Sequence, residues 1–155
     1  MNTPDLHKLL GRLQENGVKY ILVGGQAVRL HGFNRATEDI DLVVPFDEAN
    51  GERLIRSLGF LESSKDLQPW WFSKEANADE IQNIRVADEF VIDILFSANG
   101  ETYESLQPFV LHVEIGGVTI PVLNIDGLLQ TKTGYREKDA IDREALLKIK
   151  AGKTP

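Results

Sequence analysis

The sequence of 155 residues contains no cysteine and only three histidines. Without cysteine the chain forms no disulfide, has no thiolate nucleophile and offers no sulfur ligand to zinc. The histidines, His7, His31 and His112, lie far apart in the sequence and show no H-E-x-x-H spacing. A metal ion would therefore be bound through oxygen, which favours a hard cation such as Mg²⁺.

Long apolar runs are also missing. No stretch approaches the roughly 18 consecutive apolar residues that a membrane helix requires. The opening residues, MNTPDLHKLL, lack the basic, apolar and small-residue order of a signal peptide. We therefore expect a cytoplasmic protein without a membrane partner, and the length predicts a single domain over residues 1–155.

Positive charge is scarce outside the C-terminal segment. The chain carries 17 basic and 24 acidic residues, with a net charge of −7, and the basic residues are concentrated over 132–153. The rest of the chain is strongly acidic and would repel a long DNA duplex. We therefore do not expect general DNA binding. A local basic strip near the C-terminus could still hold a phosphate.

Periodicity and turn residues divide the chain into helices and strands. We expect helices over 3–17, 26–32, 47–60, 125–134 and 137–150, and strands over 19–25, 39–45, 70–74, 81–87, 90–96 and, as a hairpin, 109–123. Helices alternate with strands early in the chain, while strands cluster in the middle. This order predicts an α/β fold, with a β-sheet of mixed direction and helices packed on it.

Two acids, Asp39 and Asp41, stand at the head of the strand DIDLVV. Side chains alternate along a strand, so the two carboxylates lie on one face. Two like charges beside an apolar run are costly unless a cation compensates them. Mg²⁺ meets that need with one or two carboxylates and phosphate oxygens. Because a D-x-D pair is short and common, solvated acids at a strand end are the alternative.

Two further features add to this pair. Val23 leads into Gly24 and Gly25 and then a helix, an arrangement that lets backbone N–H groups approach a phosphate, although such glycines often mark only a tight turn. Asp93 lies inside the apolar run FVIDILF, where a lone acid needs a partner. A third acid on a neighbouring strand is what a two-metal site requires, and a buried salt bridge to an arginine is the alternative.

Together these residues resemble the DNA polymerase β-like nucleotidyltransferase superfamily. Its signature is an apolar residue and two small residues, followed after a gap by D-x-D or D-x-E, and here VGG, thirteen residues and DID follow that pattern. The resemblance implies the nucleotidyltransferase fold, and Mg²⁺ ligands at Asp39, Asp41 and Asp93, which are also catalytic. It implies nucleotide-binding roles for four residues: Gly24, Gly25, Arg35 and Thr37.

The C-terminal stretch DGLLQTKTGYREKDAIDREAL resembles the closing motifs of the AbiEii-like toxins of type IV toxin–antitoxin systems. This resemblance implies that Lys132 and Lys138 reach the triphosphate, with Lys132 stabilising the departing pyrophosphate. The alternative is that these charges pair within one helix. The matching positions are Asp126, Lys132, Arg136, Lys138, Asp139 and Asp142.

The combined resemblance implies an enzyme that moves a nucleoside monophosphate from an NTP to a hydroxyl group, using Mg²⁺ and releasing pyrophosphate. The acceptor stays open between a tRNA end, a side chain of a protein and a small antibiotic-like molecule. A rival interpretation is a non-catalytic or antitoxin-like module of the same fold that binds a partner protein. A third is a structural protein whose acids are solvated.

Trp70 and Trp71 are a separate candidate. Their rings could stack on a nucleic-acid base. On the strand expected over 70–74, however, alternation would place one of the two in the core.

Overall fold

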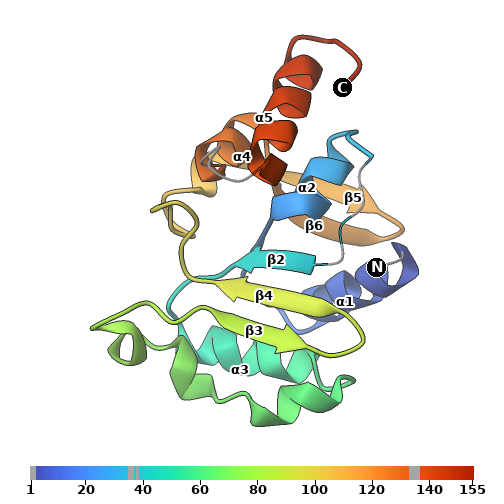
Figure 1. Ribbon diagram of the computed structural model, residues 1–155. Helices are drawn as coiled ribbons and strands as arrows, with labels where there is room; N and C mark the ends of the chain where they lie inside the picture. Colours follow the sequence, from blue (N-terminus) through green and yellow to red (C-terminus); the bar gives the residue numbers. More distant parts are fainter. Residues whose placement is uncertain (1–2, 35–36, 38, 133–136) are drawn as a thin grey trace.

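The computed structural model describes residues 3–34, 37, 39–132 and 137–155 and forms one mixed sheet with helices on both faces (Figure 1). The helices are α1 Thr3–Glu15, α2 Gly24–Leu30, α3 Glu48–Ser57, α4 Ile125–Thr131 and α5 Glu137–Lys150. The strands are β1 Ile21–Val23, β2 Asp39–Val43, β3 Ile84–Ala87, β4 Val91–Leu95, β5 Val110–Ile115 and β6 Val118–Leu123. Short 3₁₀ helices are η1 Glu62–Asp66, η2 Pro69–Phe72, η3 Glu75–Asn77 and η4 Gln107–Phe109.

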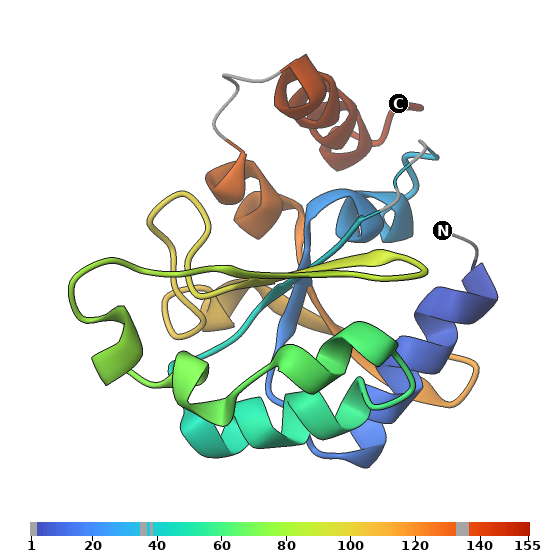
Figure 2. The same cartoon turned by 60° about the horizontal axis from the view of Figure 1, so that its bottom comes forward.

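The six strands follow the order β3-β4-β2-β1-β6-β5. Two neighbouring pairs, β1 with β6 and β2 with β4, are parallel, and the other three are antiparallel. Viewed nearly along the sheet, α1, α3 and the segment that follows α3 cover one face, while α2, α4 and α5 lie over the other (Figure 2). The prediction of an α/β fold with a mixed sheet is confirmed.

The pleat of β2 and β4 separates the core from the candidate site. On one face Ile40, Leu42, Ile92 and Ile94 are fully buried. Removing each from water contributes about 1.5–3 kcal/mol to the hydrophobic driving force. The three predicted acids, at alternate positions of the same strands, are only partly buried and face the opposite way. The core thus fixes the strands that carry the site.

The prediction of a strand over 70–74 is wrong. Residues 69–72 form the 3₁₀ helix η2, in which Trp71 N–H donates to the carbonyl oxygen of Gln68 at 3.0 Å. Pro69 begins this turn because its ring presets the required backbone angle. Phe72 is fully buried and packs on Gly51 in the middle of α3, where an added Cβ would overlap its ring. The glycine inside α3 is therefore a packing requirement.

No helix within the described ranges combines the length and the apolar composition of a membrane-crossing segment.

Replacing Gly51 by alanine should destabilise the protein, although alanine is the better helix former. The new Cβ would overlap the buried Phe72 ring, and we expect a loss of about 1–3 kcal/mol in the free energy of unfolding. Gly11→Ala in α1 is the matched control, because its Cβ would meet Val118 at an ordinary 3.6 Å; it should add about 0.5–1 kcal/mol. Urea unfolding measures both, and a gain in stability for Gly51→Ala would contradict the packing argument.

Candidate functional site

The three predicted acids come together through the pairing of β2 with β4. These strands run parallel in a register that sets Asp41 opposite Asp93 and Asp39 opposite Val91. Partners in neighbouring strands point to the same face, so all three carboxylates lie on the face away from the core. Asp41 and Asp93 are close enough to share a side-chain hydrogen bond. The structure therefore groups residues that are separated by more than fifty positions in the sequence.

The surroundings of Asp41 disfavour its ionised form. Burial is the main cause of a raised pKa at Asp41, which reaches about 7, and the negative charges of Asp93 and Asp39 add to it. The positive charge of Lys132 acts in the opposite direction. At neutral pH, Asp41 therefore holds a proton in a substantial part of the molecules, and a cation bound at this place would compete with that proton.

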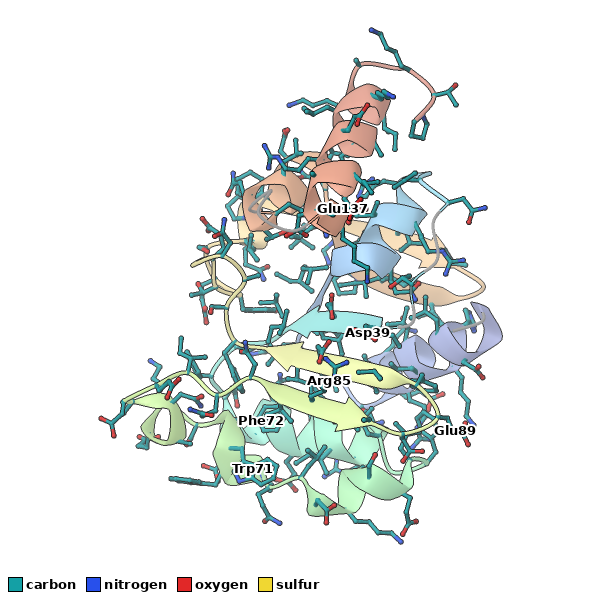
Figure 3. All side chains as sticks on the ribbon, viewed as in Figure 1. Asp39, Trp71, Phe72, Arg85, Glu89 and Glu137 are labelled. Carbon is teal, nitrogen blue, oxygen red and sulfur yellow. The ribbon has the colours of Figure 1, made fainter. Side chains whose placement is uncertain are left out.

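Arg85 is a site residue that the sequence reasoning did not identify. It lies on β3 opposite Asp93, and its guanidinium is 3.4 Å from Asp93 Oδ1 and 3.7 Å from Asp39 Oδ2. In Figure 3, Arg85 is drawn beside Asp39 on the open face of the strands. An arginine partner for Asp93 was the weighed alternative, but this one is 61% exposed, so its ion pairs are weak. Alternation along β3 is enough to indicate that the Arg85 side chain points away from the core. Only the pairing of β3 with β4 shows that it lies beside Asp93.

The donor set fits a hard cation. Carboxylate oxygens are the ligands that Mg²⁺ prefers, and the negative charges of Asp93 and Asp39 contribute, after burial, to the raised pKa of Asp41. Among the residues that the structure describes, no group of three His, Asp or Glu side chains is arranged as a ready-made metal site. Arg85 now spans Asp39 and Asp93, the oxygen donors that could hold the ion together with Asp41.

The backbone conformation and the close packing at position 24 require glycine. Its φ of +69° is in the left-handed region that other residues avoid, and an added Cβ would overlap the Asp41 carboxylate. The backbone at the start of α2 thus passes directly beside the acids. Gly25 is buried in the first turn of this seven-residue helix. Thr37 Oγ1 donates to the carbonyl oxygen of Asp39 at 3.4 Å, whereas Arg35 lies outside the described residues.

Lys132 follows α4 and is only 8% exposed. Its ammonium group lies 2.9 Å from Asp142 Oδ2 and 3.7 Å from Asp139 Oδ1, both on α5. Arg143 donates to the carbonyl oxygen of Lys132 at 3.0 Å and so fixes its backbone. The sequence singled out Lys132 because it has no acid four residues along, yet it pairs with acids seven and ten residues away. It is both an ion-pair partner and a site residue.

One pocket joins these elements. It has a volume of about 320 Å³, and its wall includes Gly24, Asp41, Asn99, Lys132 and Asp139. We call it the lysine pocket. Lys138 is exposed on the first turn of α5 and does not belong to the described residues that form this wall. The lysine pocket therefore combines an acid, a close backbone and a buried cation, which suits a phosphate chain bound through a metal ion.

Asp41→Asn should make the metal-free protein more stable at high pH. A carboxyl with a raised folded pKa stabilises the protein while protonated, and that contribution is lost as the pH rises from about 4 through about 7. Asparagine keeps the uncharged state, so we expect a gain of about 1–3 kcal/mol at about pH 8 that disappears near pH 4. Urea unfolding in the presence of a chelator measures this difference.

The control for this experiment is Asp79→Asn, which removes the same charge from an exposed position that does not line the lysine pocket. It corrects for the change in net charge. Equal pH profiles for Asp41→Asn and Asp79→Asn would refute the electrostatic account of the acid group.

Comparisons with known proteins bear on the family and the fold of the chain. Residues 5–146 match the model of the family described as aminoglycoside-2''-adenylyltransferase. The structure is similar to that of a protein from Thermotoga maritima described as a candidate nucleotidyltransferase, with a TM-score of 0.54 and 17% identity over 98% of this chain and 96% of that chain. This likeness shows the nucleotidyltransferase fold.

A second solved structure is more distant. The antibiotic-resistance factor ANT(2'')-Ia, determined in solution, has a TM-score of 0.46 and 16% identity over 98% of this chain and 96% of that chain. No curated protein has a similar sequence.

Proposed function

Because the chain belongs to the aminoglycoside-2''-adenylyltransferase family and is a nucleotidyltransferase, we propose that it transfers a nucleoside monophosphate from an NTP to a hydroxyl group of a small molecule, with release of pyrophosphate. The observation that carries the proposal is the convergence of Asp39, Asp41 and Asp93 beside Gly24 and Lys132. The family description favours ATP as the donor and an antibiotic-like molecule as the acceptor, over a tRNA end or a protein side chain.

The three acids are assigned the binding of Mg²⁺. When bound there, Mg²⁺ would neutralise phosphate charge and orient the reacting oxygens. Asp41 and Asp93, which now share a hydrogen bond, would give up the proton between them. Arg85 would release Asp39 and Asp93, a small cost because its own side chain is largely exposed to water. Binding of the metal ion would thus displace one proton and the Arg85 side chain from the acids.

The lysine pocket is assigned the triphosphate. Glycine at position 24 leaves room for the phosphates beside Asp41, and the Lys132 ammonium provides a fixed cation where pyrophosphate departs. In the transfer, the acceptor oxygen bonds to the α-phosphorus, and the bond from that phosphorus to the bridging oxygen of pyrophosphate breaks. The proton of the acceptor hydroxyl passes to a carboxylate, a role that we assign to Asp93.

The structure gives less detail on the roles of four residues that were predicted to bind the nucleotide. Gly25 supports the backbone beside Gly24, and Thr37 fixes the backbone at Asp39. Arg35 is assigned to the phosphates by resemblance only, and Lys138 is exposed at the edge of the same region. A finer hypothesis from the C-terminal resemblance is a toxin–antitoxin role with a partner protein. It predicts that partner binding survives the loss of all three acids.

Asp41→Asn should abolish nucleotide transfer while leaving the fold intact. One of the metal-binding carboxylates would be lost, and the uncharged amide replaces a residue that is already partly protonated, so the core is not disturbed. Calorimetric titration with each NTP, with and without Mg²⁺, should show metal-dependent binding in the natural protein and none in Asp39→Asn/Asp41→Asn. Retained transfer in Asp41→Asn would end the proposed role.

Lys132→Gln tests whether this lysine does more than balance two buried acids. Alone, the change leaves Asp142 without its 2.9 Å partner and should destabilise the fold by about 3 kcal/mol. The double variant Lys132→Gln/Asp142→Asn should recover most of that stability, yet transfer should stay about 100-fold or more below the natural rate. Recovery of transfer together with stability would reduce Lys132 to a structural role.

A further inference from the structure

Strand β5 is one of the two outer strands of the sheet, and its free edge carries no protection. The strand order gives it a single neighbour, β6, and among the described elements its main contacts are with that strand. Its residues pair with β6 in continuous register, so no bulge turns the edge away. The sequence VLHVEI contains neither proline nor lysine, residues that commonly block such an edge. Strand β5 can therefore accept a further strand.

The turn that ends β5 shows which of its backbone groups face the free edge. Both glycines at 116–117 have positive φ, +56° and +82°, as a two-residue hairpin turn requires. Such a turn makes Ile115 and Val118 a hydrogen-bonded pair, and these pairs alternate along antiparallel strands. The N–H and C=O groups of His112 and Glu114 therefore point away from β6, toward the free edge.

Apolar side chains follow one face of the same strand. Leu111 is 44% and Ile115 is 39% exposed, although both are large and apolar. Val113 lies between them on that face, and His112 and Glu114 occupy the other face. One face of the edge thus gains by burial, while the other presents an imidazole and a carboxylate.

A second copy of β5, running antiparallel, fits this pattern when Val113 lies opposite Val113. Leu111 then meets Ile115 of the second copy, and His112 meets Glu114. The two His112–Glu114 pairs supply about four N–H···O bonds, because their outward backbone groups face each other. A shift of one strand by two residues would set histidine opposite histidine or glutamate opposite glutamate, and like charges in opposite positions are destabilising. The self-complementary register is therefore distinguished from its neighbours.

We propose that two copies of the chain associate through β5 into a two-fold dimer with one continuous sheet. Two-fold symmetry closes the contact, so each copy uses its β5 edge once. Pairing covers Leu111 and Ile115, and the His112 imidazole donates to the Glu114 carboxylate of the second copy. The inference is independent of the proposed function, because β1 and β6 separate β5 from the strands that carry the acids.

The lack of cysteine in the natural chain permits a direct test by cross-linking. In the proposed register, residue 113 faces its own copy in a non-hydrogen-bonded pair, whose Cα atoms are about 4.5 Å apart and within reach of a disulfide. Leu111→Cys is the matched control, because it is on the same face but lies roughly 13 Å or more from its own copy. We expect Val113→Cys to form a covalent dimer about tenfold or more faster than this control.

Sedimentation velocity tests the association without a disulfide. The natural protein should approach the mass of a dimer as its concentration rises. His112→Glu places glutamate opposite glutamate in both pairs and should raise the dissociation constant about tenfold. The exchange His112→Glu/Glu114→His restores the opposite pairing and should recover the dimer. Binding of Mg²⁺–NTP, measured by calorimetry, should be the same in all three proteins.

Several results would overturn the inference. One is a natural protein that stays monomeric at every concentration, and another is an equal rate of cross-linking for Val113→Cys and Leu111→Cys. A dimer that His112→Glu leaves unchanged would place the contact on another surface, such as the exposed Trp70 and Trp71. Failure of the exchanged variant to associate would reject the register. None of these results bears on nucleotide transfer, so the two proposals fail separately.

Discussion

The parallel pairing of β2 with β4 is the constraint on which the rest of the structure depends. Its register sets Asp41 opposite Asp93, with Asp39 on the same face, and the buried isoleucines and leucines on the other face prevent the strands from slipping. A shift by one residue would place the carboxylates in the core. The free energy of apolar burial therefore holds together like charges that would otherwise separate.

The surrounding elements can be understood as responses to this concentration of negative charge. Lys132 is buried and held by Asp142 and Asp139, so it is a cation of fixed position. Arg85 is exposed and makes only loose ion pairs, so it is a replaceable one. One side of the acid group is thus rigid and the other adaptable.

Local sequence patterns sufficed for much of the fold and for the identity of the acids. Alternation predicted the strands of Asp41 and Asp93 and the common face of Asp39 and Asp41, and the paired glycines predicted the hairpin between β5 and β6. The interpretation of residues 70–74 as a strand was wrong because aromatic residues favour strands, whereas Pro69 and the packing of Phe72 on Gly51 decide this segment.

Non-local contacts account for what was missed. Arg85 meets Asp93 through strand register, and Lys132 meets Asp142 because α5 packs back over α4. No pattern in the neighbouring residues specifies either contact. The pocket lined by Trp70, Trp71 and Arg85 is also formed by non-local contacts, since η2 and β3 are separated in the sequence by η3 and a turn.

The position of β6 within the sheet bears on how the protein is made. Its Val122 pairs with Leu22 of β1, one hundred residues earlier in the chain. Likewise, β2 can complete its pairing only after β4 has been synthesised. During synthesis on the ribosome, the short strand β1 keeps an unpaired edge until most of the polypeptide has emerged, and Lys132 arrives later still. Long-range pairing of this kind slows folding. The strands that carry the three acids can thus pair before β6 emerges, whereas Lys132 and its partners on α5 join them only late in synthesis.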